Sequence, residues 1–127
     1  MRIDHLAIHV HDLDGAAKFF EEYFGATVDE TYHNPRTGLY SNFLKLEEGP
    51  RFEIMTRPEL QEQPSSTMCY GYTHMAFALG SREAVDELTE RLCEGGYEIL
   101  SGPRVTGDGY YETSLLGWEG INIEITV

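Results

Sequence analysis

The pattern of hydrophobic and polar positions along this chain occurs twice. Residues 3–10 alternate between apolar side chains and polar or small ones, and residues 72–79 repeat that alternation. A period of two is typical of a strand with one buried face. After each strand, apolar residues recur three and four positions apart, which predicts an amphipathic helix. Gly25 in the first copy and Gly95 in the second are expected to end these helices.

Three further strands are expected after each helix. They fall near residues 26–32, 39–47 and 51–57 in the first copy, and near residues 97–100, 110–116 and 121–127 in the second. The order βαβββ, found twice, predicts an α+β fold. At 127 residues we expect a single domain, with repeat one at 1–57, a linker at 58–70 and repeat two at 71–127.

Composition narrows the classes of partner. The chain has 9 Lys and Arg against 22 Asp and Glu, a formal net charge of -13. Such a charge repels phosphate backbones and anionic membrane surfaces, so we expect neither nucleic acid nor a membrane as a partner. The apolar stretches are too short to span a bilayer, and no signal-peptide pattern opens the sequence. We therefore expect a cytoplasmic location.

Both copies carry a histidine and a glutamate at matching places. His5 and His74 lie in the first strand of each copy, and Glu53 and Glu124 lie in the last. The alternation turns all four side chains away from the apolar face that the helices must cover. Taken singly, each has an ordinary explanation on the wet side of a strand. Together, two imidazoles and two carboxylates suit a divalent ion such as Zn²⁺, Ni²⁺, Co²⁺, Mn²⁺ or Fe²⁺.

At these residues the sequence resembles the vicinal oxygen chelate superfamily, which includes glyoxalase I, extradiol dioxygenases and the fosfomycin and bleomycin resistance proteins. The resemblance covers essentially the whole chain and is greatest to the bacterial glyoxalase I (lactoylglutathione lyase) branch. It implies two tandem βαβββ modules that form a U-shaped open barrel, the glyoxalase/bleomycin resistance/dioxygenase fold. It also implies a homodimer and one divalent metal ion per site. Zinc or nickel is the first expectation for this ion, followed by cobalt, manganese or iron. The ligands that it implies are His5, Glu53, His74 and Glu124.

The same resemblance implies an activity on a small-molecule substrate. A metal-dependent lyase or isomerase of this type stabilises an enediolate intermediate of a small carbonyl compound by bidentate chelation. Glu124 would be the catalytic base that moves a proton between neighbouring carbons. Where glyoxalase I has an arginine and an asparagine that hold glutathione, this chain has His9 and Arg57. These two residues are therefore candidate substrate contacts, and glutathione adducts are not the expected substrates.

Two other activities remain open at this point. An iron-dependent extradiol dioxygenase uses two histidines and one glutamate and needs three open positions, so the additional carboxylate of Glu53 argues against it. The other alternative is an antibiotic-resistance or ligand-binding member of the superfamily. The four candidate ligands do not decide for or against a resistance protein that modifies its antibiotic, and they argue against one that only sequesters it.

Overall fold

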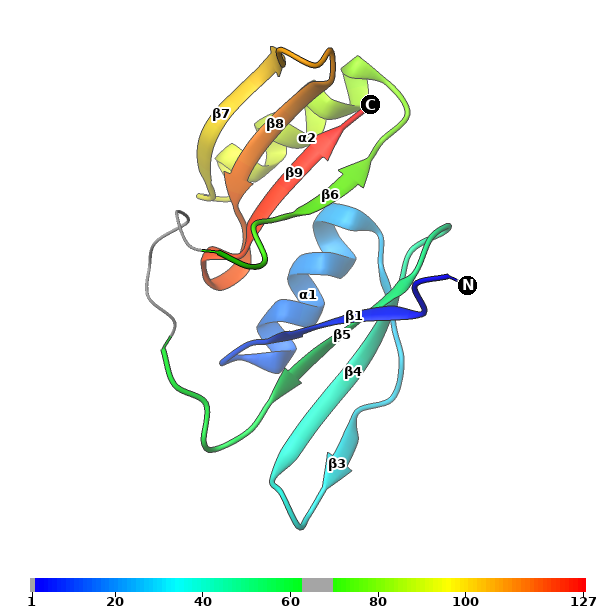
Figure 1. Cartoon of the computed structure of the whole chain (residues 1–127), viewed down its shortest axis with the longest axis vertical. Helices are drawn as coiled ribbons and strands as arrows, with labels where there is room; N and C mark the ends of the chain where they lie inside the picture. Colours follow the sequence, from blue (N-terminus) through cyan, green and yellow to red (C-terminus); the bar gives the residue numbers. More distant parts are fainter. Residues whose placement is uncertain (1, 63–69) are drawn as a thin grey trace. The chain divides into compact units, whose positions relative to one another are not determined.

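The computed structural model describes residues 2–62 and 70–127. The chain divides into two compact units, Met1–Pro64 and Ser65–Val127, and each is described by itself (Figure 1). The elements of the first unit are β1 (His5–His9), α1 (Leu13–Phe24), β2 (Thr27–Val28), β3 (Tyr32–Asn34), β4 (Leu39–Lys45) and β5 (Arg51–Thr56). Those of the second are β6 (Met75–Ala78), α2 (Arg82–Glu94), β7 (Glu98–Val105), β8 (Tyr111–Leu116), a 3-10 turn (Trp118–Gly120) and β9 (Asn122–Thr126).

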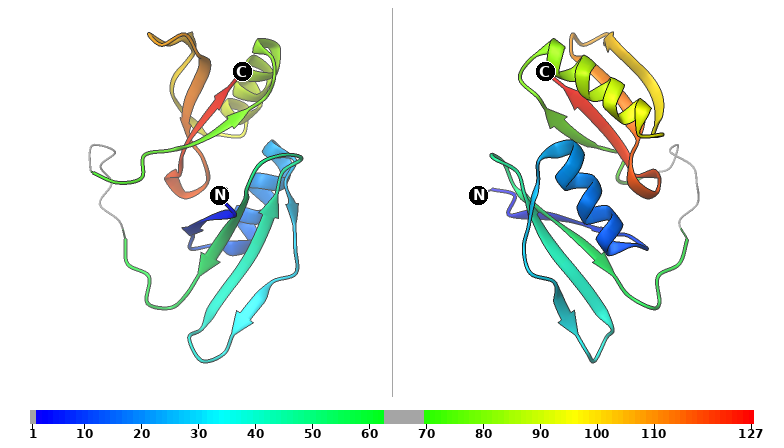
Figure 2. Two further views of the ribbon diagram at one scale, coloured as in Figure 1. Left: turned by 45° about the vertical axis from the view of Figure 1, so that its right-hand side comes forward. Right: turned by 180° about the vertical axis from the view of Figure 1, so that it is seen from behind.

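The two sheets have the same topology. The strand order is β1-β5-β4-β2 in the first unit, with β3 pairing β4, and β6-β9-β8-β7 in the second. In each sheet the first strand of the unit pairs in parallel with the last, and the other pairs are antiparallel. Each sheet is open, and a single helix lies across one face of it (Figure 2). This arrangement confirms the predicted α+β fold of two βαβββ modules.

Helix α1 ends where the sequence predicts, at Gly25, and begins at a side-chain cap. The Asp12 side chain accepts a hydrogen bond from the Gly15 amide at 3.0 Å, which caps the first turn. Gly25 ends the helix with a φ of 63°, a conformation that glycine adopts without a steric penalty. On the inner face the ring of Phe20 is fully buried and packs against Phe52 at a centroid distance of 4.7 Å. This contact fixes α1 on the first sheet.

Helix α2 is capped by Ser81, whose hydroxyl accepts a hydrogen bond from the Ala84 amide at 3.1 Å. Its buried face contains one polar residue, Thr89, between apolar neighbours. The Thr89 hydroxyl lies 2.7 Å from the carbonyl oxygen of Val85 and 2.8 Å from the hydroxyl of Thr113 on β8. Because both hydroxyls are hydrogen-bonded, the pair is accommodated in the core of the second unit.

The strand predicted at residues 26–32 is in fact two short strands, β2 and β3. Between them, side-chain hydrogen bonds supplement the backbone bond from the Asp29 amide to the Phe43 carbonyl oxygen at 3.0 Å. The Asp29 carboxylate accepts the Phe43 amide at 2.6 Å, and the buried Asn42 side chain donates to the Asp29 carbonyl oxygen and the Thr31 hydroxyl. These bonds satisfy the backbone locally and interrupt the strand.

Strand β7 is longer than the predicted strand at 97–100 and continues to Val105. It passes through two register shifts, one between Ile99 and Ser101 and one between Ser101 and Arg104, and the second contains Gly102 and Pro103. A proline is tolerated there because β7 is an edge strand and the shifts interrupt the ladder. A Cβ at Gly102 would lie 2.5 Å from the carbonyl oxygen of Glu112, so the strands approach too closely for any other residue.

The apolar face of β1 is only partly covered. Val10 is buried as expected, whereas Leu6 is 45% exposed. The reason is that β1 is an edge strand and α1 packs mainly against β2, β4 and β5. The expected burial of Met75 and Phe77 on β6 is confirmed.

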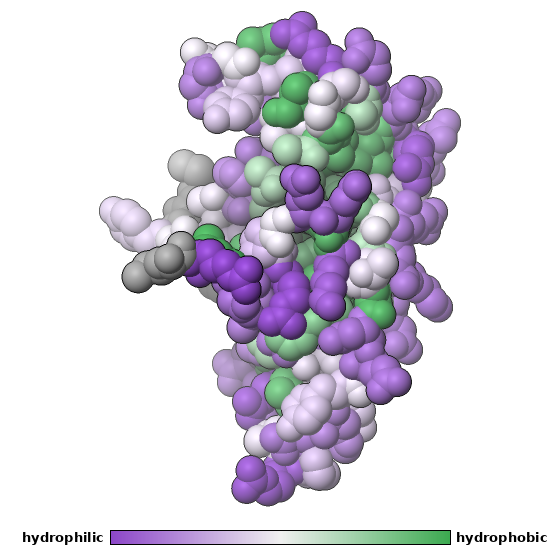
Figure 3. Space-filling view, turned by 90° about the vertical axis from the view of Figure 1, so that its right-hand side faces the viewer, coloured by the Kyte–Doolittle hydropathy of each residue, from purple (hydrophilic) through white to green (hydrophobic). Residues whose placement is uncertain are grey.

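Hydrophilic side chains cover much of the molecular face drawn in Figure 3, with smaller hydrophobic patches between them. This agrees with the excess of acidic residues in the sequence. Within the described part of the chain, neither helix has the length and apolar character needed to cross a membrane. Residues 63–69 of the predicted linker lie outside the described residues.

Candidate metal-binding residues

In the first unit, His5 and Glu53 lie on neighbouring parallel strands. The register of β1 and β5 places Glu53 opposite Ala7, two residues after His5. Side chains alternate along a strand, so His5, Ala7 and Glu53 share one face of the sheet. It is the face opposite Phe52 and therefore the one turned away from α1.

The second unit repeats this register. Strands β6 and β9 are also parallel, and Glu124 lies opposite Ala76, two residues after His74. In both units the residue beside the glutamate is thus an alanine. Its small side chain leaves space for the histidine and the glutamate to approach each other across the strands.

His74 and Glu124 make direct contact. The Nε2 atom of His74 lies 3.2 Å from Oε2 of Glu124, and its Nδ1 atom lies 3.0 Å from the hydroxyl of Thr73. The two side chains are 37% and 21% exposed, so both remain accessible. Two ligands that bind one ion at about 2.1 Å and at a right angle are about 3 Å apart. The spacing of this pair therefore fits two adjacent ligands of one ion.

His5 has a different partner. Its Nδ1 atom lies 3.0 Å from Oδ2 of Asp4, and its ring packs edge-on against Phe43 at a centroid distance of 5.3 Å. Nη2 of Arg51 donates to the same Asp4 oxygen at 2.8 Å, and the Arg51 guanidinium lies over the Phe43 ring. These contacts fix the orientation of the His5 ring through Nδ1, and Nε2 is the nitrogen left for another ligand.

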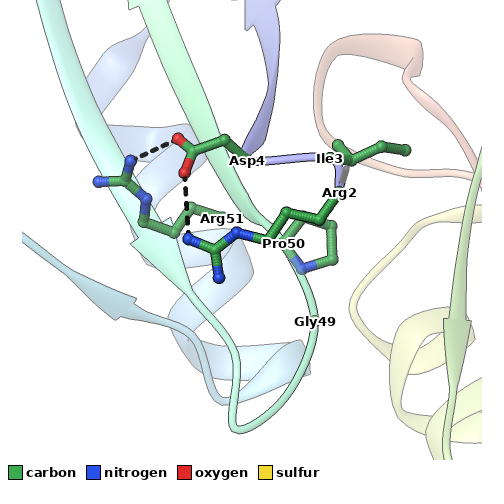
Figure 4. A pocket seen from close by; sticks show the side chains of 6 residues that line it. All are labelled: Arg2, Ile3, Asp4, Gly49, Pro50 and Arg51. Carbon is green, nitrogen blue, oxygen red and sulfur yellow. Dashed lines mark hydrogen bonds and ion pairs between the residues drawn. The ribbon is translucent and has the colours of Figure 1, made fainter.

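Asp4 lies at the centre of a small charged recess (Figure 4). It contacts Arg51 on one side and Arg2, at 3.7 Å, on the other. Hydrogen bonds from His5 and from Arg51, together with the Arg51 charge, lower the pKa of Asp4 to about 2. The remaining lining residues are Ile3, Gly49 and Pro50. Asp4 is consequently an ionised hydrogen-bond acceptor at neutral pH.

The two candidate substrate contacts are on or next to the same strands. His9 lies on β1 opposite Met55, on the face that carries His5, and it is exposed. Arg57 follows the end of β5, and its Nε donates to Glu59 at 2.9 Å. That hydrogen bond lowers the pKa of the Glu59 carboxyl group.

Glu53 and Glu124 have different neighbours on the antiparallel strand that lies on their other side. Ser114 of β8 lies opposite Glu124, whereas Phe43 of β4 lies opposite Glu53. Glu124 is therefore flanked by small side chains, Ser114 and Ala76. The residue opposite Glu124 on β8 is thus smaller than the residue opposite Glu53 on β4.

Each unit thus supplies a histidine and a glutamate in one register. Among residues 2–62 and 70–127, no group of three or more His, Cys, Asp or Glu side chains lies close enough to hold a metal ion.

Comparison with known proteins identifies a family and a relative of this chain. The model of the family described as "Glyoxalase/Bleomycin resistance protein/Dioxygenase superfamily" matches residues 2–125. The uncharacterized protein PA2024 of Pseudomonas aeruginosa is 37% identical over 97 residues, which are 74% of this chain and 65% of that protein. The chain therefore spans just under two thirds of the length of this relative.

Solved structures show the same fold. The trypanothione-dependent glyoxalase I of Leishmania major has a TM-score of 0.79 and 21% identity, and the alignment covers 99% of this chain and 86% of that one. The fosfomycin resistance protein FosX of Listeria monocytogenes, solved with Mn(II) and sulfate, has a TM-score of 0.72 and 22% identity, with 98% and 90% covered.

Proposed function

Because the chain belongs to the glyoxalase/bleomycin resistance protein/dioxygenase superfamily, we propose that it is a divalent-metal-dependent lyase or isomerase of the glyoxalase I type, acting on a small carbonyl compound. The observation that carries this proposal is the repeated register, in which each unit sets a histidine diagonally across from a glutamate. The same two residue types thus occupy equivalent positions in both units.

The proposed ligands are His5, Glu53, His74 and Glu124. Two imidazole nitrogens and two carboxylate oxygens form a donor set for zinc or nickel, and also for cobalt, manganese or iron. The separation of 3.2 Å between His74 and Glu124 supports this assignment for the second unit. The Mn(II) bound in the structure of FosX, which shares the fold, is compatible with a divalent ion here.

Glu124 is the proposed catalytic base. A bound divalent cation would supply Lewis acidity that stabilises negative charge on two adjacent substrate oxygens. The Oε2 atom of Glu124 then accepts a proton from the substrate carbon next to a carbonyl. Glu124 returns this proton to the neighbouring carbon. The small side chains of Ser114 and Ala76 beside Glu124 support this assignment, since the reacting carbon must come within hydrogen-bonding distance of the base.

His9 and Arg57 remain the proposed substrate contacts. His9 lies four residues after His5 on β1, on the same face of the sheet. Arg57 already pairs with Glu59, so an anionic substrate group would have to replace that carboxylate. This exchange is feasible because both partners are substantially exposed, at 40% and 65%.

Metal content and thermal unfolding test the proposal. The purified protein should carry about one ion per chain, and chelation should lower its unfolding temperature. Adding back an ion at 100 times its Kd should restore about 2.7 kcal/mol of stability. His5→Ala and His74→Ala should lose this gain, and His33→Ala, which removes a strand histidine stacked on Tyr40, should keep it. If the wild-type protein binds none of the five ions, the metal-dependent activity is wrong.

A further inference from the structure

We propose that Arg104 on β7 binds an anionic end of the substrate, and that this end is a carboxylate. This inference rests on the proposed function and narrows its substrate class to small carbonyl compounds that carry a carboxylate away from the reacting carbon. All the residues involved belong to the second unit, which also contains the proposed base Glu124.

The side chain of Arg104 lies on the sheet face turned away from α2. Thr113 of β8 points toward α2, where its hydroxyl lies 2.8 Å from that of Thr89. Side chains alternate along a strand, so Glu112 and Ser114, the neighbours of Thr113, point to the opposite face. Arg104 pairs with Glu112, and its Nη1 atom lies 3.4 Å from a carboxylate oxygen of Glu112. Arg104 therefore shares the face of Glu112 and Ser114.

The strand ladder connects this face to the proposed base. Ser114 pairs with Glu124 on one side and with Ser101 on the other. Ser101 in turn contacts Arg104, whose Nε donates to the serine hydroxyl at 2.6 Å. Neighbouring strands are about 4.8 Å apart, so Glu124 and Ser101 are about 10 Å apart across the sheet. A small molecule that contacts Glu124 at one end can therefore contact Arg104 at the other, with two serine side chains between them.

The guanidinium of Arg104 has donors available for a ligand. An arginine side chain carries five N–H donors in a fixed fork. Nε is bound to Ser101, but the Nη1 contact with Glu112 is long for a charge-assisted hydrogen bond, which is usually about 2.7–2.9 Å. Within the part of the chain that the structure describes, Nη2 of Arg104 has no hydrogen-bond or ion-pair partner. The side chain is also 42% exposed, so a small anion can reach it.

The charge of the molecule favours a fixed cation in the path of an anionic substrate. A chain with a formal net charge of -13 repels anions. Apart from histidine, the other basic side chains among residues 70–127 are Arg82 and Arg91, and both lie on α2. That helix covers the opposite face of the sheet, where Arg82 lies over the ring of Tyr111. In the second unit, Arg104 is thus the arginine on the face of the proposed base.

A carboxylate suits this position better than a phosphate. Its two oxygens lie in one plane and match the fork of a guanidinium. Glu112 and Glu124 already place negative charge on this face, and a doubly charged phosphate is repelled more strongly than a singly charged carboxylate. The bound carboxylate would replace Glu112 at Nη1 of Arg104, where the existing contact is long.

Titration of the purified protein with 5-hydroxylevulinate tests the contact. This compound has an α-hydroxyketone at one end and a carboxylate at the other, and its methyl ester lacks the charge. The Nε–H signal of Arg104 in a nitrogen-15 NMR spectrum, assigned by its loss in Arg104→Gln, reports binding. We expect the acid to shift this signal saturably and the ester to leave it unchanged. No shift with the acid, or equal shifts with acid and ester, would overturn the proposal, and tighter binding of inorganic phosphate would overturn the choice of a carboxylate.

Variants separate a specific contact from an effect of net charge, with the Kd measured from the NMR signals of 5-hydroxylevulinate itself. Arg104→Gln should raise the Kd about 10-fold or more, as expected for the loss of a hydrogen bond between charged groups. Arg91→Gln removes the same charge from α2 of the same unit, and its Kd should equal that of the wild type. Equal Kd values in the two variants would count against Arg104.

Glu112→Gln gives a change in the opposite direction. The amide keeps an oxygen for Nη1 of Arg104 but removes the charge that competes with the ligand. The acid should therefore bind more tightly to Glu112→Gln than to the wild-type protein. Weaker binding would contradict the replacement of Glu112 by the substrate carboxylate.

The failure of this proposal differs from the failure of the proposed function. If 5-hydroxylevulinate shifts the Arg104 signal but the protein binds no divalent ion, the carboxylate contact stands and the metal-dependent activity is wrong. With an ion bound, Arg104→Gln should raise the KM for exchange of the hydroxymethyl protons of the acid with deuterated water and leave kcat nearly unchanged. If the acid and the ester exchange with equal KM in the wild-type protein, the activity stands and Arg104 does not select the substrate.

Discussion

Glu124 and His74 touch each other, yet the proposed function gives them different tasks. Glu124→Gln keeps an oxygen at the same place and should leave the ion largely bound, but an amide cannot take up a proton. We expect proton transfer to fall by about 10²–10⁴-fold, the usual contribution of a general base. His74→Ala should lose metal and activity together. Metal content and exchange of the substrate proton with deuterated water measure the two effects separately.

The matched control for Glu124→Gln is Glu98→Gln, which changes an exposed glutamate on β7 of the same sheet. It should keep both metal and activity. If Glu124→Gln is as active as the wild type, Glu124 is not the base, even if it remains a ligand.

The sequence predicted the orientation of the four candidate ligands but not their hydrogen-bond partners. The alternation of the strands predicted that His5, Glu53, His74 and Glu124 lie on the sheet faces away from the helices, and the register agrees with it. The partners of the ring nitrogens could not be predicted. They depend on rotamers and on contacts between distant residues, such as Arg51 with Asp4, which no periodicity encodes. The signal that was available is the polar residue directly before each histidine.

At the scale of elements, the close approach of β7 and β8 depends on Gly102. Its φ of 102° is unfavourable for other residues, and a Cβ would contact the Glu112 carbonyl and Thr113. Gly102→Ala should therefore destabilise the protein by about 3 kcal/mol, from backbone strain and overpacking together. Urea denaturation measures the change.

The control is Gly107→Ala in the following turn, where a Cβ has no neighbour within 4 Å. Its effect should stay within about 0.5 kcal/mol. Equal stability of the two variants would show that β7 adjusts to a side chain at position 102, contrary to the structure.

The hydroxyl pair of Thr89 and Thr113 connects α2 with β8 inside the core. Replacing either residue by valine leaves a buried hydroxyl with one bond fewer, which should cost about 1 kcal/mol. The double variant replaces both hydroxyls by methyl groups and should cost less than the sum of the single changes. A double-mutant cycle on the free energy of unfolding measures this coupling. Strictly additive effects would contradict a direct interaction.

The elements that the sequence predicted best have local signals. Both helices begin at a side-chain cap, Asp12 or Ser81, and α1 ends at a left-handed glycine. The predictions at residues 26–32 and 97–100 were less accurate because long-range contacts decide there. Asp29 bonds to β4, and β7 is extended by its pairing with β8. Tertiary hydrogen bonds of this kind are not visible in a local pattern.

At the scale of the whole molecule, the repeat gives each unit half of the proposed ligand set. The α+β fold followed from the repeat and from the resemblance, because both modules show the same order of elements. The sequence does not determine whether the two units that form one site belong to the same chain or to two chains. A site within one chain and a site shared by two chains use the same four residues, so the sequence is compatible with both.

A mixing experiment separates these arrangements. We expect a homodimer by light scattering, and mixing two ligand variants distinguishes sites within one chain from sites shared by two chains. His5→Ala and Glu124→Ala each remove one ligand, from different units, and each should bind no metal alone. After the two variants are unfolded and refolded together, half of the dimers are mixed, and in each of these one of two shared sites is intact. For sites shared by two chains, metal content should then recover to about one quarter of the wild-type value, as two-fold symmetry requires.

The control mixture is His5→Ala with Glu53→Ala. Both changes lie in the first unit, so neither arrangement regenerates an intact site and no metal should be recovered. If the mixture of His5→Ala and Glu124→Ala also recovers none while the wild-type protein reloads fully after the same treatment, each site is built within a single chain. The four ligands then belong to one protomer, and any dimer would serve stability and not the site.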